Sequence, residues 1–184
     1  MFDTGTTTSF VARELTGHRR LTVVTNSSDI ARTLATVNGN RVYLAGGELR
    51  SDSGAAFGKS ALDFINRFTV NHSIISTGAV DTAGVMDFDL EESEFARVVL
   101  SRGERKVVVT DKSKFGRRGL IVVTGFSGID ELVSDASPPH RSRIIRVASS
   151  RPGPVKAGST PRSTSSLLTL GSKPSKTSSR PTAR

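Results

Sequence analysis

The apolar positions of the chain change their periodicity several times before residue 137. Short unbroken runs of Val, Ile and Leu predict strands, and between them apolar residues recur at helical spacing. The predicted strands cover residues 21–25, 41–45, 73–77 and 106–110, with two weaker ones at 120–123 and 131–134. The predicted helices cover residues 9–15, 29–37, 59–68 and 91–100. Unbroken apolar strands that alternate with helices indicate βαβ units, so the sequence predicts an α/β fold with a Rossmann-like parallel sheet.

Small polar residues follow the first two of these strands directly. Asn26 and Ser27 come after the first, and Gly46 and Gly47 come after the second. Each pair could form an ordinary turn or cap, and Ser28 is the expected N-cap of the next helix. In a parallel sheet, however, the carboxyl ends of the strands meet at one edge, where ligands bind. The convergence of small polar groups at that edge favours a binding site.

The segment Asp3-Thr4-Gly5-Thr6-Thr7-Thr8 leads into the first predicted helix. Gly5 lets a ligand approach the backbone, and the first N–H groups of a helix are unpaired and lie at the positive end of its dipole. The loop therefore suits a phosphate or another anion. The alternative is a helix that is capped by Thr7 or Thr8 and binds nothing. Only Met1 and Phe2 remain of the strand that normally precedes such a loop, so we expect the chain to begin inside a domain.

Charged residues follow later strands. Lys114, just after the strand at 106–110, could pair with an anionic ligand, while Asp111 could orient that lysine or accept a hydroxyl group. The alternative is a solvated turn. Asp81 offers a carboxylate at another strand end, and Glu94 lies one helix later. The three histidines lack the spacing of metal ligands, so neither a metal nor a cofactor is expected.

The charge of the chain is divided unevenly. The net charge is +9, but all 17 acidic residues precede residue 138, whereas residues 138–184 hold 10 of the 26 basic residues and all seven prolines. This Ser-, Pro- and Arg-rich segment has too little apolar surface to fold, so we expect a folded domain at 1–137 and a disordered tail at 138–184. The tail could contact nucleic acid weakly and without sequence specificity, or it could have no role.

Composition also excludes several classes of protein. The absence of cysteine excludes a disulfide-stapled secreted scaffold. No apolar run is long enough to span a membrane, and the first residues lack the pattern of a signal peptide. A cytoplasmic protein with no membrane partner is therefore expected.

Several loops together resemble the C-terminal sensor domain of DeoR-family bacterial transcription regulators. The segments that carry this resemblance are DTGTTT at 3–8, LTVVTNS at 21–27, YLAGGELR at 43–50, GAVDTAGVMDFDLEESEFAR at 78–97, TDKSKF at 110–115 and IDELVSD at 129–135. The resemblance implies a fold similar to ribose-5-phosphate isomerases and CoA transferases. It also implies a phosphorylated sugar or polyol as effector, and a domain that forms homo-oligomers.

The resemblance assigns roles to particular residues. It places the phosphate at Gly5, Thr6, Thr7 and Thr8, with supporting roles for Asp3, Asn26, Ser27, Gly46, Gly47, Asp81, Glu94 and Lys114. Regulators of this family contact DNA through an N-terminal winged helix-turn-helix, which this chain lacks. We therefore expect a truncated regulator whose specific DNA contact depends on a domain absent from the chain.

The alternative function is that of a sugar-phosphate isomerase. The isomerase relatives use a lysine and an additional acid near the segment that corresponds to residues 81–90. Here Thr82 follows Asp81, and residues 85–90 contain no lysine. Since such catalytic groups act as a unit, binding without turnover is the better interpretation.

Overall fold

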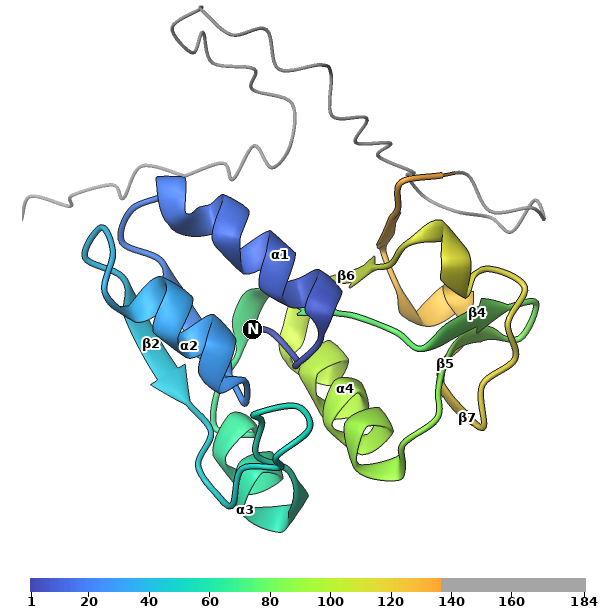
Figure 1. Cartoon of the computed structure of the whole chain (residues 1–184), viewed down its shortest axis with the longest axis horizontal. Helices are drawn as coiled ribbons and strands as arrows, with labels where there is room; N and C mark the ends of the chain where they lie inside the picture. The colour runs from blue at the N-terminus through green and yellow to red at the C-terminus, as the bar shows by residue number, and fades with distance from the viewer. Residues whose placement is uncertain (137–184) are drawn as a thin grey trace, which may run out of the picture. The chain divides into compact units, whose positions relative to one another are not determined.

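The computed structural model describes residues 1–136, in which helices and strands alternate (Figure 1). The helices are α1 (Thr6–Glu14), α2 (Ser28–Ala35), α3 (Gly58–Ile65) and α4 (Leu90–Arg102), and the short 3-10 helices are η1 (Leu15–Gly17), η2 (Lys112–Lys114) and η3 (Phe126–Gly128). The strands are β1 (Thr22–Thr25), β2 (Arg41–Leu44), β3 (Val70–Ile75), β4 (Ala79–Asp81), β5 (Gly84–Asp87), β6 (Gly103–Val109), β7 (Ile121–Thr124) and β8 (Glu131–Val133). The predicted α/β class is confirmed. No helix in this part of the chain is long and apolar enough to cross a membrane.

The main sheet is parallel throughout. Its order is β2, β1, the segment at Phe2, β3, β6 and β8. Phe2 bridges Thr25 of β1 on one side and Ile74 of β3 on the other. Its amide donates a hydrogen bond to the Val24 carbonyl (2.8 Å), and the Ile74 amide donates to the Met1 carbonyl (2.9 Å). The first two residues therefore join the two halves of the sheet.

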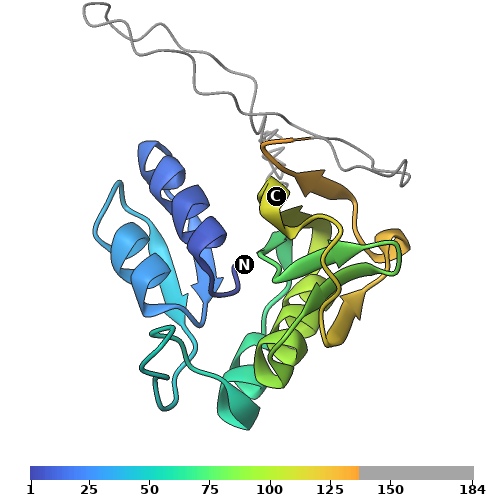
Figure 2. The same ribbon diagram turned by 45° about the vertical axis from the view of Figure 1, so that its right-hand side comes forward.

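Alternate residues of the parallel strands pack into two separate hydrophobic cores. Val23 and Ile74 belong to the core beneath α1 and α2, whereas their neighbours Val24 and Ile75 belong to the core that contains residues of α3 and α4. Figure 2 shows the blue helices α1 and α2 on one side of the strands and the green helices α3 and α4 on the other. Both faces of the sheet are covered, which explains why its strands carry no polar alternation.

A second, antiparallel sheet of β4, β5 and β7 was not predicted. Thr82 and Ala83 form the turn between β4 and β5, and Gly84 follows with a φ of 131°, in the region that favours glycine. In addition, a Cβ on Gly84 would lie 2.3 Å from the Thr124 carbonyl oxygen of the neighbouring β7. Strands as short as those of this hairpin show no clear periodicity of apolar residues, so the sequence did not indicate them.

The structure corrects several predicted boundaries. α1 begins at Thr6 rather than at residue 9, α3 ends at Ile65 rather than at 68, and β3 covers Val70–Ile75 rather than 73–77. The N-cap of α2 is Ser27, not Ser28, because the Ser27 hydroxyl accepts the Ile30 amide (3.3 Å). The predicted disordered tail at 138–184 lies outside the described residues.

Candidate functional site

A cavity of about 340 Å³ lies where the carboxyl ends of the parallel strands meet the starts of several helices. It is lined by Thr4, Gly5, Thr6, Ser9, Phe10, Arg13, Ser27, Asp29, Asp52, Ser53 and Glu92. Thr6 begins α1, while Asp29 and Glu92 lie in the first turns of α2 and α4. The cavity has the size of a small-molecule site, and the positive ends of these helix dipoles offset part of its negative charge.

The start of α1 is open to a ligand. Gly5 is the N-cap, and within residues 1–136 no side chain accepts a hydrogen bond from the first amides of this helix. The starts of α2 and α4, in contrast, are capped by the side chains of Ser27 and Asp89. Thr8 does not cap α1, since its hydroxyl donates to the Gly5 carbonyl (3.0 Å). The first amides of α1 are therefore available to an external acceptor.

One face of α1 forms a wall of the cavity. Thr6, Ser9, Phe10 and Arg13 are spaced by three or four residues, so they lie along the same side of the helix. The Arg13 guanidinium carbon lies 5.3 Å from the centroid of the Phe10 ring. Its Nη2 is 4.0 Å from Asp29 Oδ2, and both side chains of that pair are partly exposed.

Arg50 joins the loop before α3 to the start of α4. Its Nη2 lies 2.8 Å from Asp52 Oδ2 and its Nη1 lies 2.9 Å from Asp89 Oδ2. Asp89 in turn accepts the Glu92 amide (3.0 Å). The Arg50 hydrogen bond lowers the pKa of Asp52, and the Glu92 amide, assisted by Arg50, lowers the pKa of Asp89. Arg50 thus anchors both segments that supply the lining carboxylates Asp52 and Glu92.

Glu92 differs from Asp52 in its electrostatic surroundings. Its side chain is half-buried, and burial raises the pKa of its carboxyl group. The neighbouring carboxylates of Asp87, Asp89 and Asp52 act in the same direction, whereas Arg50 opposes them. This side of the cavity is therefore acidic and disfavours an additional anion.

Asp3 fastens the loop before α1 to the end of β3. Its Oδ2 accepts the Ser76 amide (2.9 Å) and the Ser76 hydroxyl (3.3 Å). Burial raises the pKa of Asp3 well above its usual value, and the Ser76 amide opposes that shift. The lining residues Thr4 and Gly5 follow directly, so Asp3 fixes where they lie.

Some buried polar atoms around the site have unused hydrogen-bonding capacity. Asp3 Oδ1, Asn26 Oδ1 and Ser53 Oγ have no hydrogen-bond partner within residues 1–136. Buried polar groups are normally paired, so each needs an explanation. Ser53 lines the cavity itself.

The structure brings together only part of the set of residues expected from the sequence. Gly5, Thr6 and Ser27 line the cavity. Asp3, Thr8 and Asn26 are buried, and the Asn26 side-chain amide donates to the Ala56 carbonyl (2.9 Å). Thr7, Gly46, Gly47, Asp81, Glu94 and Lys114 are not among the lining residues. Of these, Asp81 accepts the Ala83 amide in the β4–β5 turn (2.7 Å), Glu94 is exposed on α4, and Lys114 is half-buried in η2.

Other lining residues were missed in the sequence. They are Thr4, Ser9, Phe10, Arg13, Asp29, Asp52, Ser53 and Glu92. Arg13 could have been found by following the helical spacing from Thr6. Asp52 and Glu92 carry no such signal, because they are 40 positions apart and look like ordinary surface acids. No group of three or more side chains placed to hold a metal ion occurs within the described part of the chain.

Comparisons with known proteins match most of this chain to one family. Residues 1–136 match the family described as the DeoR C terminal sensor domain. The glycerol-3-phosphate regulon repressor of Escherichia coli (strain K12) is 37% identical over 138 residues, which cover 74% of this chain and 55% of that protein. The protein of the same name from Haemophilus influenzae is 31% identical over 137 residues, covering 74% and 53%. The HTH-type transcriptional repressor CsqR of Escherichia coli is 29% identical over 136 residues, covering 73% and 52%. The chain thus spans about half the length of the curated relatives it matches.

Proposed function

Because this chain belongs to the DeoR family, whose C-terminal sensor domain it contains, we propose that it binds a phosphorylated sugar or polyol in the cavity beside α1. In this proposal the domain senses the effector for a transcriptional repressor and does not convert it. Repression itself would need DNA contact through the helix-turn-helix that regulators of this family carry, and the sensor domain would form homo-oligomers.

The observation that carries the proposal is the uncapped start of α1. A phosphate placed there would accept hydrogen bonds from the first amides of the helix and would lie at the positive end of its dipole. Gly5 and Thr6 line the cavity at this point, and so does Thr4, in the residues just before the helix. The arrangement recognises an anion through the backbone.

The names of the relatives suggest which phosphate to test first. Two of them are glycerol-3-phosphate regulon repressors, so glycerol 3-phosphate is our first candidate. A cavity of about 340 Å³ would accept this molecule and also larger sugar phosphates. The relatives named here are transcriptional repressors, which favours a sensor over the alternative isomerase.

The proposal is tested with a panel of ligands. Glycerol 3-phosphate, ribose 5-phosphate and fructose 6-phosphate are compared with glycerol, ribose and fructose by thermal shift and calorimetry. At least one phosphate should bind at least tenfold more tightly than its unphosphorylated parent. If the parents bind as tightly as the phosphates, or if a phosphate is isomerised by the chain, the proposal is wrong.

A single substitution isolates the role of the backbone. Thr6 is the first residue of α1, a position where proline is well tolerated and follows an extended residue such as Gly5. Thr6→Pro removes one amide donor and should weaken phosphate binding about tenfold, since a charge-assisted hydrogen bond contributes roughly 1.5–3 kcal/mol. The matched variant Thr6→Ala keeps the amide and should bind within about threefold of the wild type.

A further inference from the structure

We infer that the cavity is divided into a phosphate side along α1, where Arg13 supplies the cation, and a hydroxyl side formed by Ser53, Asp52 and Glu92. This inference rests on the proposed function and extends it to the orientation of the ligand. It predicts an effector with a phosphate at one end and hydroxyl groups at the other.

Arg13 is the single cationic side chain among the residues that line the cavity in the described part of the chain. Helical side chains lean toward the N-terminus of their helix, and the Arg13 guanidinium lies over the ring of Phe10, which is one turn closer to Thr6. The guanidinium therefore lies beside a residue one turn nearer to the start of α1. A phosphate between the guanidinium and the first amides of α1 would be bound by both.

The pairing of Asp29 leaves Arg13 available for such a ligand. Asp29 is contacted by two arginines, and the Arg32 contact is the shorter one, 3.4 Å against 4.0 Å for Arg13. Arg32 is not among the lining residues. Because Arg32 already compensates the charge of Asp29, a phosphate can recruit Arg13 without leaving that carboxylate unpaired.

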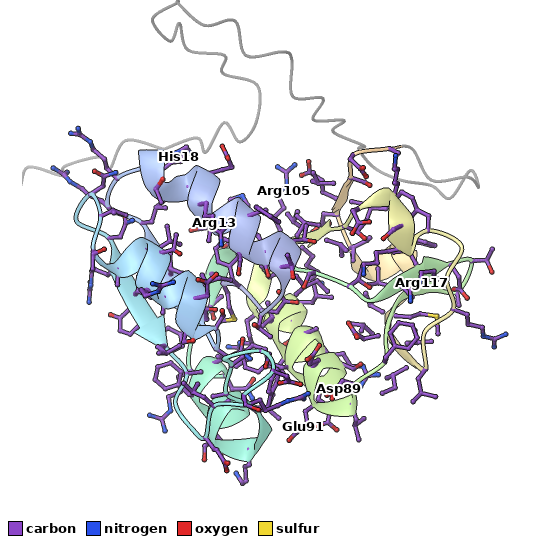
Figure 3. The ribbon with its side chains drawn as sticks, viewed as in Figure 1. Arg13, His18, Asp89, Glu91, Arg105 and Arg117 are labelled. Atoms are coloured by element: carbon purple, nitrogen blue, oxygen red, sulfur yellow. The ribbon has the colours of Figure 1, made fainter. Side chains whose placement is uncertain are left out.

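The other side of the cavity selects against a phosphate and for hydroxyl groups. Asp52 is fixed by both donor atoms of the Arg50 fork (2.8 and 3.3 Å), and Glu92 lies among further carboxylates. Like charges repel a phosphate here, whereas carboxylate oxygens accept hydrogen bonds from hydroxyl groups. Figure 3 shows Arg13 on α1 and, apart from it, Asp89 and Glu91 at the start of α4, the helix whose first turn also contains the lining residue Glu92.

Ser53 provides an independent indication of a ligand on this side. Its Oγ is buried and has no hydrogen-bond partner within residues 1–136, although the residue lines the cavity. A hydroxyl group of a bound polyol would satisfy it. The cavity thus has an unpaired polar group at the hydroxyl side and open amides at the phosphate side.

Three small ligands distinguish the two sides. Glycerol 3-phosphate carries both kinds of group, n-propyl phosphate lacks the hydroxyls, and glycerol lacks the phosphate. Arg13→Gln should weaken both phosphates about tenfold and leave glycerol unchanged. Ser53→Ala and Glu92→Gln should weaken glycerol 3-phosphate severalfold relative to n-propyl phosphate. Ser53→Ala should leave n-propyl phosphate unchanged, and Glu92→Gln should leave it unchanged or strengthen it, because this variant removes a charge that repels the phosphate. Lys59→Gln and Glu104→Gln make the same changes of charge outside the lining and should alter no affinity by more than about twofold.

The Ser53→Ala variant also separates binding from stability. Since it removes an unpaired buried hydroxyl, it should unfold at the same temperature as the wild type or higher. The inference is overturned if Arg13→Gln spares the phosphates, or if the Ser53 and Glu92 variants weaken both phosphates equally. The wild type could bind sugar phosphates but not glycerol 3-phosphate. In that case ribose 5-phosphate and 2-deoxyribose 5-phosphate, which differ by one hydroxyl group, replace glycerol 3-phosphate and n-propyl phosphate in the comparison. If no phosphate of the panel binds the wild type, the proposed function fails and the inference with it.

Discussion

The side chain of Ser76 fills the space that a Cβ on Gly5 would need, since such an atom would lie 2.1 Å from Ser76 Oγ. The Gly5 backbone itself is extended, with a φ of 161°, so its conformation does not require glycine. The requirement is one of space. Ser76 cannot simply turn away, because its hydroxyl is hydrogen-bonded to Asp3 and to the Thr4 carbonyl (3.3 and 3.2 Å). A change at Gly5 therefore disturbs packing before it affects any ligand.

Gly5→Ala should destabilise the fold by about 1–3 kcal/mol, the usual cost of overpacking. Ser76→Gly removes the atoms that the new Cβ would meet, so the double variant should recover much of that loss. Urea unfolding of the wild type, the two single variants and the double variant measures the coupling. Strictly additive effects of the two substitutions would contradict the steric explanation.

Asp3→Asn should change how stability depends on pH. Burial raises the pKa of Asp3 above its ordinary value of 3.8, so the folded state favours the neutral carboxyl group. The neutral Asp3 carboxyl group therefore stabilises the fold at pH values below its ordinary pKa. This stabilisation is lost as the pH rises through the raised pKa of the folded state. The melting temperature of Asp3→Asn minus that of the wild type should therefore increase from about pH 4 toward pH 8. A difference that stays constant over this range would show that Asp3 titrates normally.

Arg50→Lys should weaken binding of the effector while preserving charge. Lysine cannot reproduce the two parallel hydrogen bonds to Asp52, so Asp52 and the adjoining Ser53 would no longer be fixed at the cavity. Calorimetry with glycerol 3-phosphate should show a severalfold loss of affinity, with n-propyl phosphate unaffected. Arg105→Lys is the control, because Arg105 pairs with Glu131 and does not line the cavity. Equal effects of the two variants would contradict the role of Arg50.

Lys114→Gln should change the affinity for phosphorylated ligands by less than about twofold. Lys114 lies in η2 and its charge helps to lower the pKa of Asp111, but it is not a lining residue of the cavity. The same calorimetric titration tests this prediction. A tenfold loss would show instead that Lys114 contacts the bound phosphate, the supporting role that the family resemblance implies for it.

The parallel sheet could be predicted because burial on both faces is visible in the sequence. Val23 and Val24 enter different cores, so both must be apolar. The β4–β5 hairpin could not be predicted in this way. Ala79–Asp81 is too short to show a periodic pattern of apolar residues, and it forms a strand only by pairing with β5. The loop at α1 was recognisable from Gly5 and its threonines. The acidic side of the cavity was not, since only the folded chain brings Asp52 and Glu92 together.

The bridge at Phe2 makes the centre of the main sheet a seam. β1 and β2, with α1 and α2, lie on one side of it, and β3, β6 and β8 lie on the other. The cavity spans this seam, since Arg13 belongs to the first side and Glu92 to α4, which packs against β3. A ligand that contacts both Arg13 and Glu92 would link the two halves of the sheet. The amide protons of Phe2 and Ile74, whose hydrogen bonds to the Val24 and Met1 carbonyls cross the seam, would then both exchange more slowly, so that a bound ligand reduces local opening on both sides of the sheet.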